Sequence, residues 1–346
     1  LDAIAVHHDM LRLRADGSRV YINKVSDLLY DFTEEDAANL TEVEAKSDAL
    51  QRSINLSAGP VLKAALFHLP ENDVVVMICH HLAVDGVSWR IIAEDLNSGY
   101  QMATEGKEIV LPKKTHSYKH YAEAIHRYRD SYALSQEKTY WESIQAKLMA
   151  LPQGGGNGTS GQVQKLHVNY TNESVRHLLT DAHAAYGTNE NDLLVAALVR
   201  SYRKLTGKSS ASVLMEGHGR EPIHEPLVTD RTVGWFTSTY PLVVENLNGD
   251  IRHDVRIVKE TFRSVPNKGL GYGILEYIPS AEGDANLRTD LTALLGLNYL
   301  GELTEGGNDA VLDINMQIAT GAMVNPEGIE RLGENWTYLL TSCPEK

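Results

Sequence analysis

Cysteine is nearly absent from this chain of 346 residues, which contains only Cys79 and Cys343. Two cysteines cannot build the disulfide framework of a small secreted domain, so we expect a reducing compartment, the cytoplasm. No apolar run approaches the roughly 18 residues of a membrane span, and no signal-peptide pattern opens the chain. The first residue is Leu1 rather than methionine, so we expect a piece of a longer protein.

Basic residues are also scarce. Lys and Arg number 32 against 46 Asp and Glu, which leaves a net charge of −14. An acidic surface argues against nucleic acid or an anionic membrane as the main partner. Hydrophobic residues make up 42% of the chain. At about 150 residues per domain this length suggests two domains or one bilobal domain, large enough to bury a core without disulfides.

Strand-like and helix-like segments alternate along the chain, which indicates the α/β class. We expect strands at 61–69, 74–79, 165–170 and 212–215. We expect helices within 31–50 and at 88–100, 117–128, 137–149, 173–186, 191–205 and 327–340, with Ser88 capping the second of these. A Gly-rich run at 153–161 predicts a linker between two halves.

The apolar segment 74–79 has the length and β-branching of a strand buried on both faces. It ends in His80-His81, and Asp85-Gly86 follow before the next helix. Imidazoles at a strand end lie where α/β proteins keep their sites, and histidine moves protons near neutral pH. Adjacent side chains of an extended backbone point to opposite sides, so one histidine faces a given cavity. A structural histidine is the plainer alternative, and a metal site is weaker because nearby ligands lack metal spacing.

Another expected strand ends in Glu216-Gly217-His218-Gly219-Arg220-Glu221. The glycines permit unusual backbone angles, and a carboxylate there acts as general acid or base if burial raises its pKa. The alternative is a salt-bridged loop in which Arg220 pairs with Glu216 or Glu221. Further on, 266–273 (PNKGLGYG) lacks the signature of a nucleotide-binding loop and is better explained as a tight loop lining a cleft. Tyr299, beside Asn298, either donates hydrogen bonds to a substrate or is a half-buried strand residue.

These stretches together resemble one family. Residues 80–89 (HHLAVDGVSW) match the His-His-x-x-x-Asp-Gly signature of the condensation-domain superfamily of nonribosomal peptide synthetases. Four later blocks resemble, in order, the motif set of its epimerization domains: EGHGRE at 216–221, RTVGWFTSTYP at 231–241, PNKGLGYGIL at 266–275 and NYLG at 298–301. Five ordered blocks across nearly the whole chain make the resemblance specific.

The resemblance implies an α/β fold of two chloramphenicol-acetyltransferase-like lobes that form a V with a central tunnel. Residues 1–152 would form the N-terminal lobe with the His-His motif, and residues 162–346 the C-terminal lobe with the other blocks. The run at 153–161 would be the linker between them. His81 and Glu216 would then lie on opposite walls of the tunnel.

The activity implied is inversion, L to D, at the Cα of an aminoacyl or peptidyl thioester on the phosphopantetheine arm of a carrier protein. His81 and Glu216 would exchange the proton, and Tyr299 would donate a hydrogen bond to the enolate oxygen. Supporting positions in the motifs are His80, Asp85, Gly86, Arg220 and Asn298. Candidate residues of the channel for the arm are Trp235, Ser238 and Asn267. Neither a metal ion nor a cofactor bound by this domain is expected, and Asp85 is expected to pair with a cation, Arg220, from the other lobe.

The implied partners are an upstream peptidyl carrier protein domain and other synthetase modules. Lys113, Lys114 and His120 form a local basic stretch for docking, with a solvated loop as the alternative. A condensation domain that forms peptide bonds shares the His-His motif but is not expected to carry Glu216 in its block. A dual epimerization–condensation domain would need a longer second histidine motif than 7–9. A catalytically silent docking module would not need both His81 and Glu216.

Overall fold

The computed structural model describes residues 1–17, 19–148, 168, 170–223, 226–281, 283, 285–287 and 295–299, and the backbones of the strands Asp313–Ala319 and Trp336–Cys343. These residues divide into two compact units. Unit 1 comprises Leu1–Tyr121, Leu227–Phe236 and the described part of Leu300–Lys346, and unit 2 comprises Ala122–Pro226 and Thr237–Tyr299.

The two units do not follow the expected linear division into 1–152 and 162–346. Helix α5 (Tyr132–Lys147) packs against elements of unit 2, and strand β10 (Trp336–Cys343) pairs with a strand of unit 1. The expected linker at 153–161 lies outside the described residues. The compact units are defined by packing between segments that are distant in the chain. A local change in composition, such as a Gly-rich run, does not reveal that packing.

Unit 1 is built around a mixed sheet of strand order β3-β4-β5-β10-β9. Its strands are β3 (Asp31–Asp36), β4 (Leu62–His68), β5 (Asp73–Cys79), β9 (Asp313–Ala319) and β10. Its helices are α1 (Asp2–His7), η1 (Asp9–Arg12), α2 (Leu40–Arg52), η2 (His81–Ala83) and α3 (Gly86–Thr104). A hairpin of β1 (Leu13–Asp16) and β2 (Arg19–Ile22) turns at Gly17.

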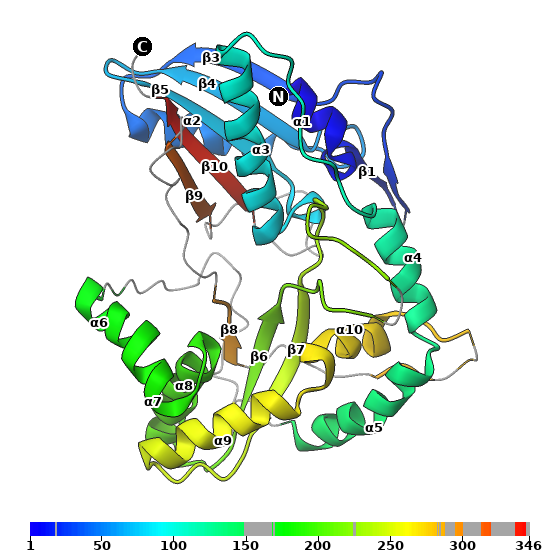
Figure 1. The fold of residues 1–346 in the computed structure, drawn as a ribbon, viewed down its shortest axis with the longest axis vertical. Coiled ribbons are helices and arrows are strands. Elements are labelled where there is room, and N and C mark those ends of the chain that lie inside the picture. The colour runs from blue at the N-terminus through cyan, green and yellow to red at the C-terminus, as the bar shows by residue number, and fades with distance from the viewer. Residues whose placement is uncertain are drawn as a thin grey trace. The chain divides into compact units, whose positions relative to one another are not determined.

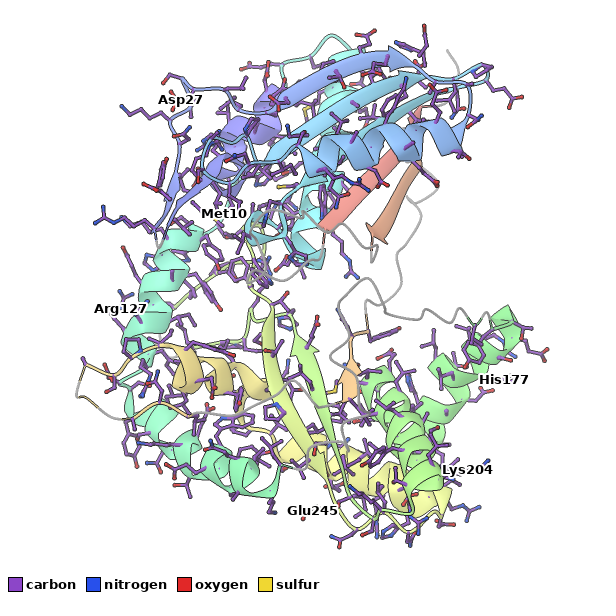
Figure 2. The ribbon with its side chains drawn as sticks, turned by 180° about the vertical axis from the view of Figure 1, so that it is seen from behind. Met10, Asp27, Arg127, His177, Lys204 and Glu245 are labelled. Carbon is purple, nitrogen blue, oxygen red and sulfur yellow. The ribbon has the colours of Figure 1, made fainter. Side chains whose placement is uncertain are left out.

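The central strand β5 is buried on both faces, as its composition predicts. Met77 and Cys79 pack in one cluster with Trp89 of α3, whereas Val76 and Ile78 pack in another with Val43 of α2. Figure 1 shows α3 in front of the sheet, and the reverse view in Figure 2 shows α2 on the other face, with Met10 labelled near the sheet and Asp27 on the loop after β2. Both faces are covered because consecutive residues of β5 are apolar, so the side chains that point to either face are apolar.

Two expected helices of unit 1 differ in part from the structure. The helix expected within 31–50 begins only at Leu40, because 31–36 form β3, which pairs in parallel with β4 and turns its acidic residues outward at the sheet edge. The helix expected at 327–340 is contradicted at its end, since Trp336–Leu340 belong to β10, while 327–335 lie outside the described residues. Pairing with β5 and β9 satisfies the β10 backbone, and Trp-Thr-Tyr suits a strand.

Unit 2 holds a sheet of order β7-β6-β8 with helices packed around it. Its strands are β6 (Ala211–Gly217), β7 (Ser238–Val244) and β8 (Leu295–Leu297). Besides α5, its helical elements are α6 (Asn172–His177), the π-turn Leu178–Ala182, α7 (His183–Tyr186), α8 (Glu190–Thr206), α9 (Ile251–Ser264), η5 (Pro266–Gly269) and α10 (Leu270–Tyr277). Helix α4 (Tyr118–Tyr128) crosses from unit 1 into unit 2.

Local sequence signals account for most of the helices. The helices expected at 117–128, 137–149, 173–186 and 191–205 are confirmed, and Gly207 ends α8 in the left-handed conformation. Sequence reasoning missed α9 and α10. Asp250 caps α9, with Val255 and Val258 buried, so that signal was present. The strand expected at 165–170 lies mostly outside the described residues. The mixed α/β class is confirmed.

Membrane insertion finds no support among the described helices, none of which combines the length and apolarity needed for a bilayer crossing.

Gly269, between η5 and α10, offers a direct test of this packing. It has a φ of +88°, and a Cβ there would lie 2.1 Å from Cδ1 of the Tyr240 ring. We expect Gly269→Ala to lower the free energy of unfolding by about 1–3 kcal/mol or more, because both backbone and ring must move. Gly273→Ala in α10 is the matched control, because no atom lies within 4 Å of that Cβ. Urea unfolding measures both, and equal stability of the two variants would contradict the described contact.

Candidate active site

His80 and His81, at the end of β5, occupy different environments. His80 is buried, and its Nδ1 accepts a hydrogen bond from the Leu82 amide at 3.1 Å. Burial lowers the pKa of His80 to about 4, and repulsion by His81 adds to the effect. His80 is therefore neutral near pH 7 and stabilises the turn into η2.

His81 is half-buried at the start of η2. Its Nδ1 is buried and makes no hydrogen bond to any described residue. Its ring meets the Trp235 ring edge to face, with centroids 5.3 Å apart. A buried ring nitrogen without a hydrogen-bonded partner is uncommon in a folded protein, so Nδ1 of His81 needs an explanation.

Asp85 caps α3, which corrects the expectation that Ser88 is the cap. The Asp85 Oδ1 accepts from both the backbone N–H and the Oγ of Ser88 at 2.7 Å, and Oδ2 accepts from the Phe236 amide at 3.1 Å. Ser88 instead occupies the first turn, where its own N–H needs a cap. Asp85 is thus bound to groups within unit 1, and its pairing with Arg220 of unit 2 stays a prediction.

Gly86 and Ser88, in the first turn of α3, differ in how far their packing depends on the residue type. Gly86 starts α3 at an exposed position where a Cβ would meet no described atom within 4 Å. Packing of the described residues therefore does not require glycine there. The Ser88 hydroxyl has one proton, which Asp85 Oδ1 and the Gly234 carbonyl, 2.8 Å away, share, and its oxygen accepts from the Gly234 amide at 3.0 Å. Ser88 and Asp85 together fasten the segment 234–236 to the start of α3.

In unit 2, Glu216 lies near the end of β6 with its side chain exposed. Desolvation by the surrounding protein raises the pKa of its carboxyl. No described residue forms a hydrogen bond or ion pair with that carboxyl. The alternative of an ion pair between Glu216 and Arg220 is therefore wrong. Glu221 forms ion pairs with His218 and Lys268.

The sheet of unit 2 brings other expected residues to the edge at Glu216. Strand β8 runs parallel to β6 with Met215 opposite Leu297, so Asn298 and Tyr299 follow at that edge and are exposed. Ser238 lies opposite Gly217 in the register of β6 and β7. Strand topology thus gathers Glu216, Ser238 and Tyr299, which are far apart in sequence.

The loop 266–269 reaches the same edge. Its Lys268 carbonyl would lie 3.7 Å from a Cβ at Gly217. Asn267 and Lys268 have φ values of 41° and 48°, in the left-handed region that costs a side-chain-bearing residue energy. Asn267 Nδ2 donates to the Pro222 carbonyl at 3.4 Å, and Lys268 Nζ lies 3.1 Å from the Glu221 carboxylate. Sequence reasoning identified the loop but missed this strain and the Lys268 anchor.

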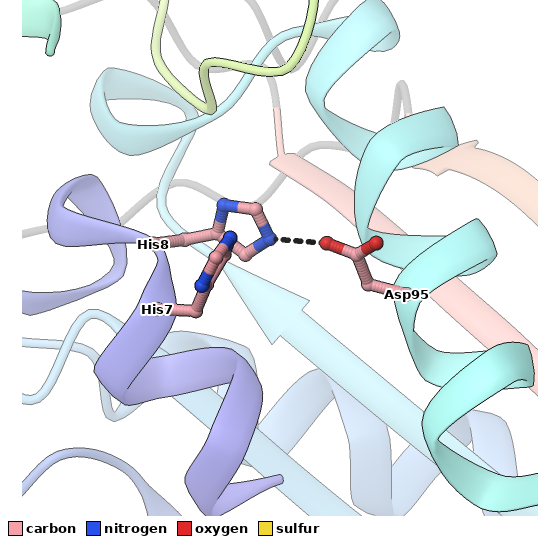
Figure 3. A group of neighbouring side chains, drawn as sticks. All are labelled: His7, His8 and Asp95. Carbon is pink, nitrogen blue, oxygen red and sulfur yellow. Dashed lines mark hydrogen bonds and ion pairs between the residues drawn. The ribbon is translucent and has the colours of Figure 1, made fainter. Parts of the chain in front are cut away.

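A histidine cluster that the sequence analysis did not single out as a site lies elsewhere in unit 1. Figure 3 shows the His8 ring facing Asp95, with His7 beside it, and His8 Nε2 lies 2.8 Å from Asp95 Oδ2. The three residues offer ligand atoms within 4.8 Å of one another, a donor set that suits zinc. Arg231, however, binds the other Asp95 oxygen, and Lys114 donates to the His7 carbonyl. The positive charges of Arg231 and Lys114 oppose the binding of a metal ion. The hydrogen bonds and ion pairs of His8, Asp95 and Arg231 instead attach α1 and the segment 227–236 to α3.

The basic stretch expected to dock a partner is partly used within the chain. Lys114 Nζ lies 3.0 Å from the Asp9 carboxylate and is about half exposed. The His120 ring stacks on His116 with centroids 4.8 Å apart. Docking by Lys113, Lys114 and His120 stays a prediction.

The role of Asp85 can be tested by stability. Asp85→Ala removes the helix cap and leaves the buried Phe236 N–H without its acceptor, so we expect a loss of about 2–5 kcal/mol. Asp250→Ala is the matched control, because Asp250 caps α9 through the His253 amide at an exposed site. That change should cost only about 0.5–2 kcal/mol. If urea unfolding finds equal losses, Asp85 does not join α3 to the segment 234–236.

Comparisons with known proteins are consistent over nearly the whole chain. The family model described as "Condensation domain" matches residues 1–324. Surfactin synthase subunit 1 of Bacillus subtilis is 37% identical over 348 residues, covering 94% of this chain and 10% of that protein. Tyrocidine synthase 1 of Brevibacillus parabrevis is 36% identical, covering 87% of this chain and 29% of that protein. The chain spans about a tenth of the first curated relatives it matches.

Solved structures agree with this assignment. The epimerization domain from the third module of tyrocidine synthetase B has a TM-score of 0.79 and 30% identity, covering 99% of this chain and 82% of that one. The first condensation domain of the CDA synthetase has a TM-score of 0.65 and 16% identity, covering 99% and 80%, which shows the shared fold. With its family model, its relatives and its fold in agreement, the chain belongs to the condensation-domain family of nonribosomal peptide synthetases.

Proposed function

We propose that this chain is an epimerization domain, which inverts the Cα of an aminoacyl or peptidyl thioester carried on the phosphopantetheine arm of a carrier protein. The observation that carries the proposal is Glu216, a carboxyl with a raised pKa and no described hydrogen-bonded partner, at the strand end where the epimerization-like block EGHGRE begins. The likeness to a solved epimerization domain at 30% identity supports it.

The chemistry requires two proton-transfer groups. A thioester acidifies its Cα–H, but a base must still remove the proton, and an acid must return it on the opposite face. Each positioned acid or base contributes about 10²–10⁴-fold to such a reaction. We assign these roles to His81 and Glu216, since each has a polar atom that the described fold leaves unused.

The developing enolate needs a hydrogen-bond donor. The phenol of Tyr299, exposed at the same sheet edge as Glu216, is the proposed donor. Asn298, Ser238 and Asn267 share this edge or its loop, and we propose that they line the path of the arm. This reaction draws on the acidity of the thioester and the two proton-transfer groups, so no metal ion or pyridoxal phosphate is proposed.

The proposed partner is a peptidyl carrier protein, with further synthetase modules in the same pathway of peptide antibiotic synthesis. A tethered arm raises the local substrate concentration without tight binding, so the docking surface can be small. With a net charge of −14, docking to an acidic carrier would depend on local basic residues, for which Lys113, Lys114 and His120 are the candidates.

Solvent exchange at Cα tests the proposal. A peptidyl carrier protein loaded with L- or D-aminoacyl-phosphopantetheine, from a panel of amino acids, is incubated with the domain in deuterated water. We expect deuterium at Cα and a D/L mixture from either enantiomer, measured by mass spectrometry and chiral analysis. Glu216→Gln and His81→Ala should each lose both signals by at least about 10²-fold. Glu260→Gln, an exposed carboxylate on α9 paired with Arg263, is the matched control and should retain them.

Other results distinguish the alternatives. Near wild-type exchange in Glu216→Gln would exclude the proposed role of Glu216. No exchange in the wild type, with amide formation when a second aminoacyl carrier is added, would identify a peptide-bond-forming condensation domain. If the domain catalyses neither Cα exchange nor amide formation, the remaining alternative is a catalytically silent docking module.

The raised pKa of Glu216 also predicts a pH-dependent difference in stability. A carboxyl with a higher pKa in the folded state binds protons more tightly when folded, so its contribution to stability is present below pH 4.5 and is lost as pH rises through the folded pKa. Glu216→Gln removes this loss. We therefore expect its Tm to exceed that of the wild type at pH 7.5, with a gap that narrows below pH 4.5. A constant gap from pH 3.5 to 8 would contradict the raised pKa.

A further inference from the structure

The imidazole of His81 lacks the usual device that orients a catalytic histidine. Such a histidine commonly gives its second ring nitrogen to a carboxylate or a carbonyl, which sets the tautomer and the ring plane. Nδ1 of His81 is buried and makes no hydrogen bond with any residue in the described part of the chain. The nearby carboxylate, Asp85, is occupied by Ser88 and the Phe236 amide. Another contact must hold the ring.

Trp235 supplies such a contact. Its ring meets the His81 ring at 61° with centroids 5.3 Å apart, within the range of favourable aromatic pairs. The side chain of Trp235 remains 37% exposed, so its ring is not consumed by the core. The indole of Trp235 is neither buried in the core nor fully exposed to solvent, and it contacts His81, the candidate proton carrier. Such a ring suits a positioning role.

The backbone that carries Trp235 is fastened on both sides. Ser88 Oγ holds Gly234 at both its N–H and its carbonyl, and Asp85 holds the Phe236 amide. The Tyr118 hydroxyl donates to the Trp235 carbonyl at 2.7 Å. Gly234 has no room for a Cβ, which would lie 2.3 Å from the Tyr118 ring. The hydrogen bonds from Ser88, Asp85 and Tyr118 are all made to the backbone of 234–236, so they do not require the Trp235 side chain.

The start of the same segment is held by charge. Arg231 bridges Glu94 and Asp95 of α3, and Asp95 in turn pairs with His8. The contacts at 231, 234 and 236 bind α3 or its capping aspartate, and the Tyr118 hydroxyl of α4 binds the Trp235 carbonyl. His81 lies in η2, which is followed in the chain by α3. Trp235 and His81 are therefore both attached to α3.

We infer that Trp235 is a positioning residue that orients the His81 imidazole for proton transfer, rather than a wall of the channel for the arm. The part of this inference that concerns catalysis rests on the proposed function. The part that concerns ring orientation does not, because it follows from the contact inside unit 1.

Nuclear magnetic resonance of the domain labelled at histidine ¹³Cε1 tests the contact without any substrate. The His81 signal is assigned by its loss in His81→Ala. We expect Trp235→Ala to move this signal, because the ring current of the indole is lost, and Trp235→Phe to restore most of the difference. Tyr21→Ala, which removes an exposed aromatic ring of β2 in the same unit, should leave the signal unchanged. An unmoved His81 signal in Trp235→Ala overturns the inference.

Kinetics of Cα exchange on the aminoacyl carrier test the consequence. Trp235→Ala should lower kcat by about 10- to 100-fold with KM unchanged, because the ring is misplaced while arm binding is not. Trp235→Phe should recover most of the rate, and Tyr21→Ala should match the wild type. A raised KM with unchanged kcat would make Trp235 a channel residue and overturn the inference. Absence of exchange in the wild type would reject the proposed function instead, while the resonance experiment would still decide the contact.

Discussion

Unit 1 depends on one buried carboxylate. Asp85 accepts hydrogen bonds from the first turn of α3 and from the amide of Phe236, a residue 151 positions later in the chain. A carboxylate can accept several hydrogen bonds at once, and the amide groups of a helix N-terminus stabilise its charge. The start of α3 and the segment 234–236 are therefore positioned by the same side chain. Asp85 can serve the site in this way without touching a substrate.

The ionisable groups of both units separate into satisfied and unsatisfied ones. Asp85, Asp95 and Glu221 are each bound by two partners within their own unit, which explains them as structural. His81 retains a buried ring nitrogen without a hydrogen bond to a described residue, and Glu216 retains a carboxyl that none of them binds. Folding normally satisfies buried polar atoms, so the buried Nδ1 of His81 needs an explanation, whereas the exposed carboxyl of Glu216 is open to a ligand.

Backbone strain is concentrated near Glu216. Asn267 and Lys268 adopt left-handed conformations, and Gly269 continues them against the Tyr240 ring. Ties from this loop to Pro222 and Glu221 hold the chain that follows Glu216. Strain of this kind persists only where surrounding contacts over-determine the backbone, and it is frequent at functional sites. A rigid loop here fixes the surroundings of a carboxyl that itself has no described hydrogen bond.

Local physical chemistry made much of this protein readable from its sequence. Apolar residues through 74–79 predicted a strand buried on both faces, the adjacent His80 and His81 predicted opposite environments, and Gly207 predicted a helix end. These features depend on neighbours within a few residues. The tertiary structure alone decided that residues 336–340 form a strand between β5 and β9, and that Asp85 rather than Ser88 caps α3. It also decided that Trp235 rests on His81 and that β8 brings Tyr299 to the edge at Glu216. Such outcomes depend on hydrogen bonds and packing between segments that are distant in the chain. The free energy of these contacts outweighs the local conformational preference of the residues, and the contacts produce no periodic pattern in the sequence.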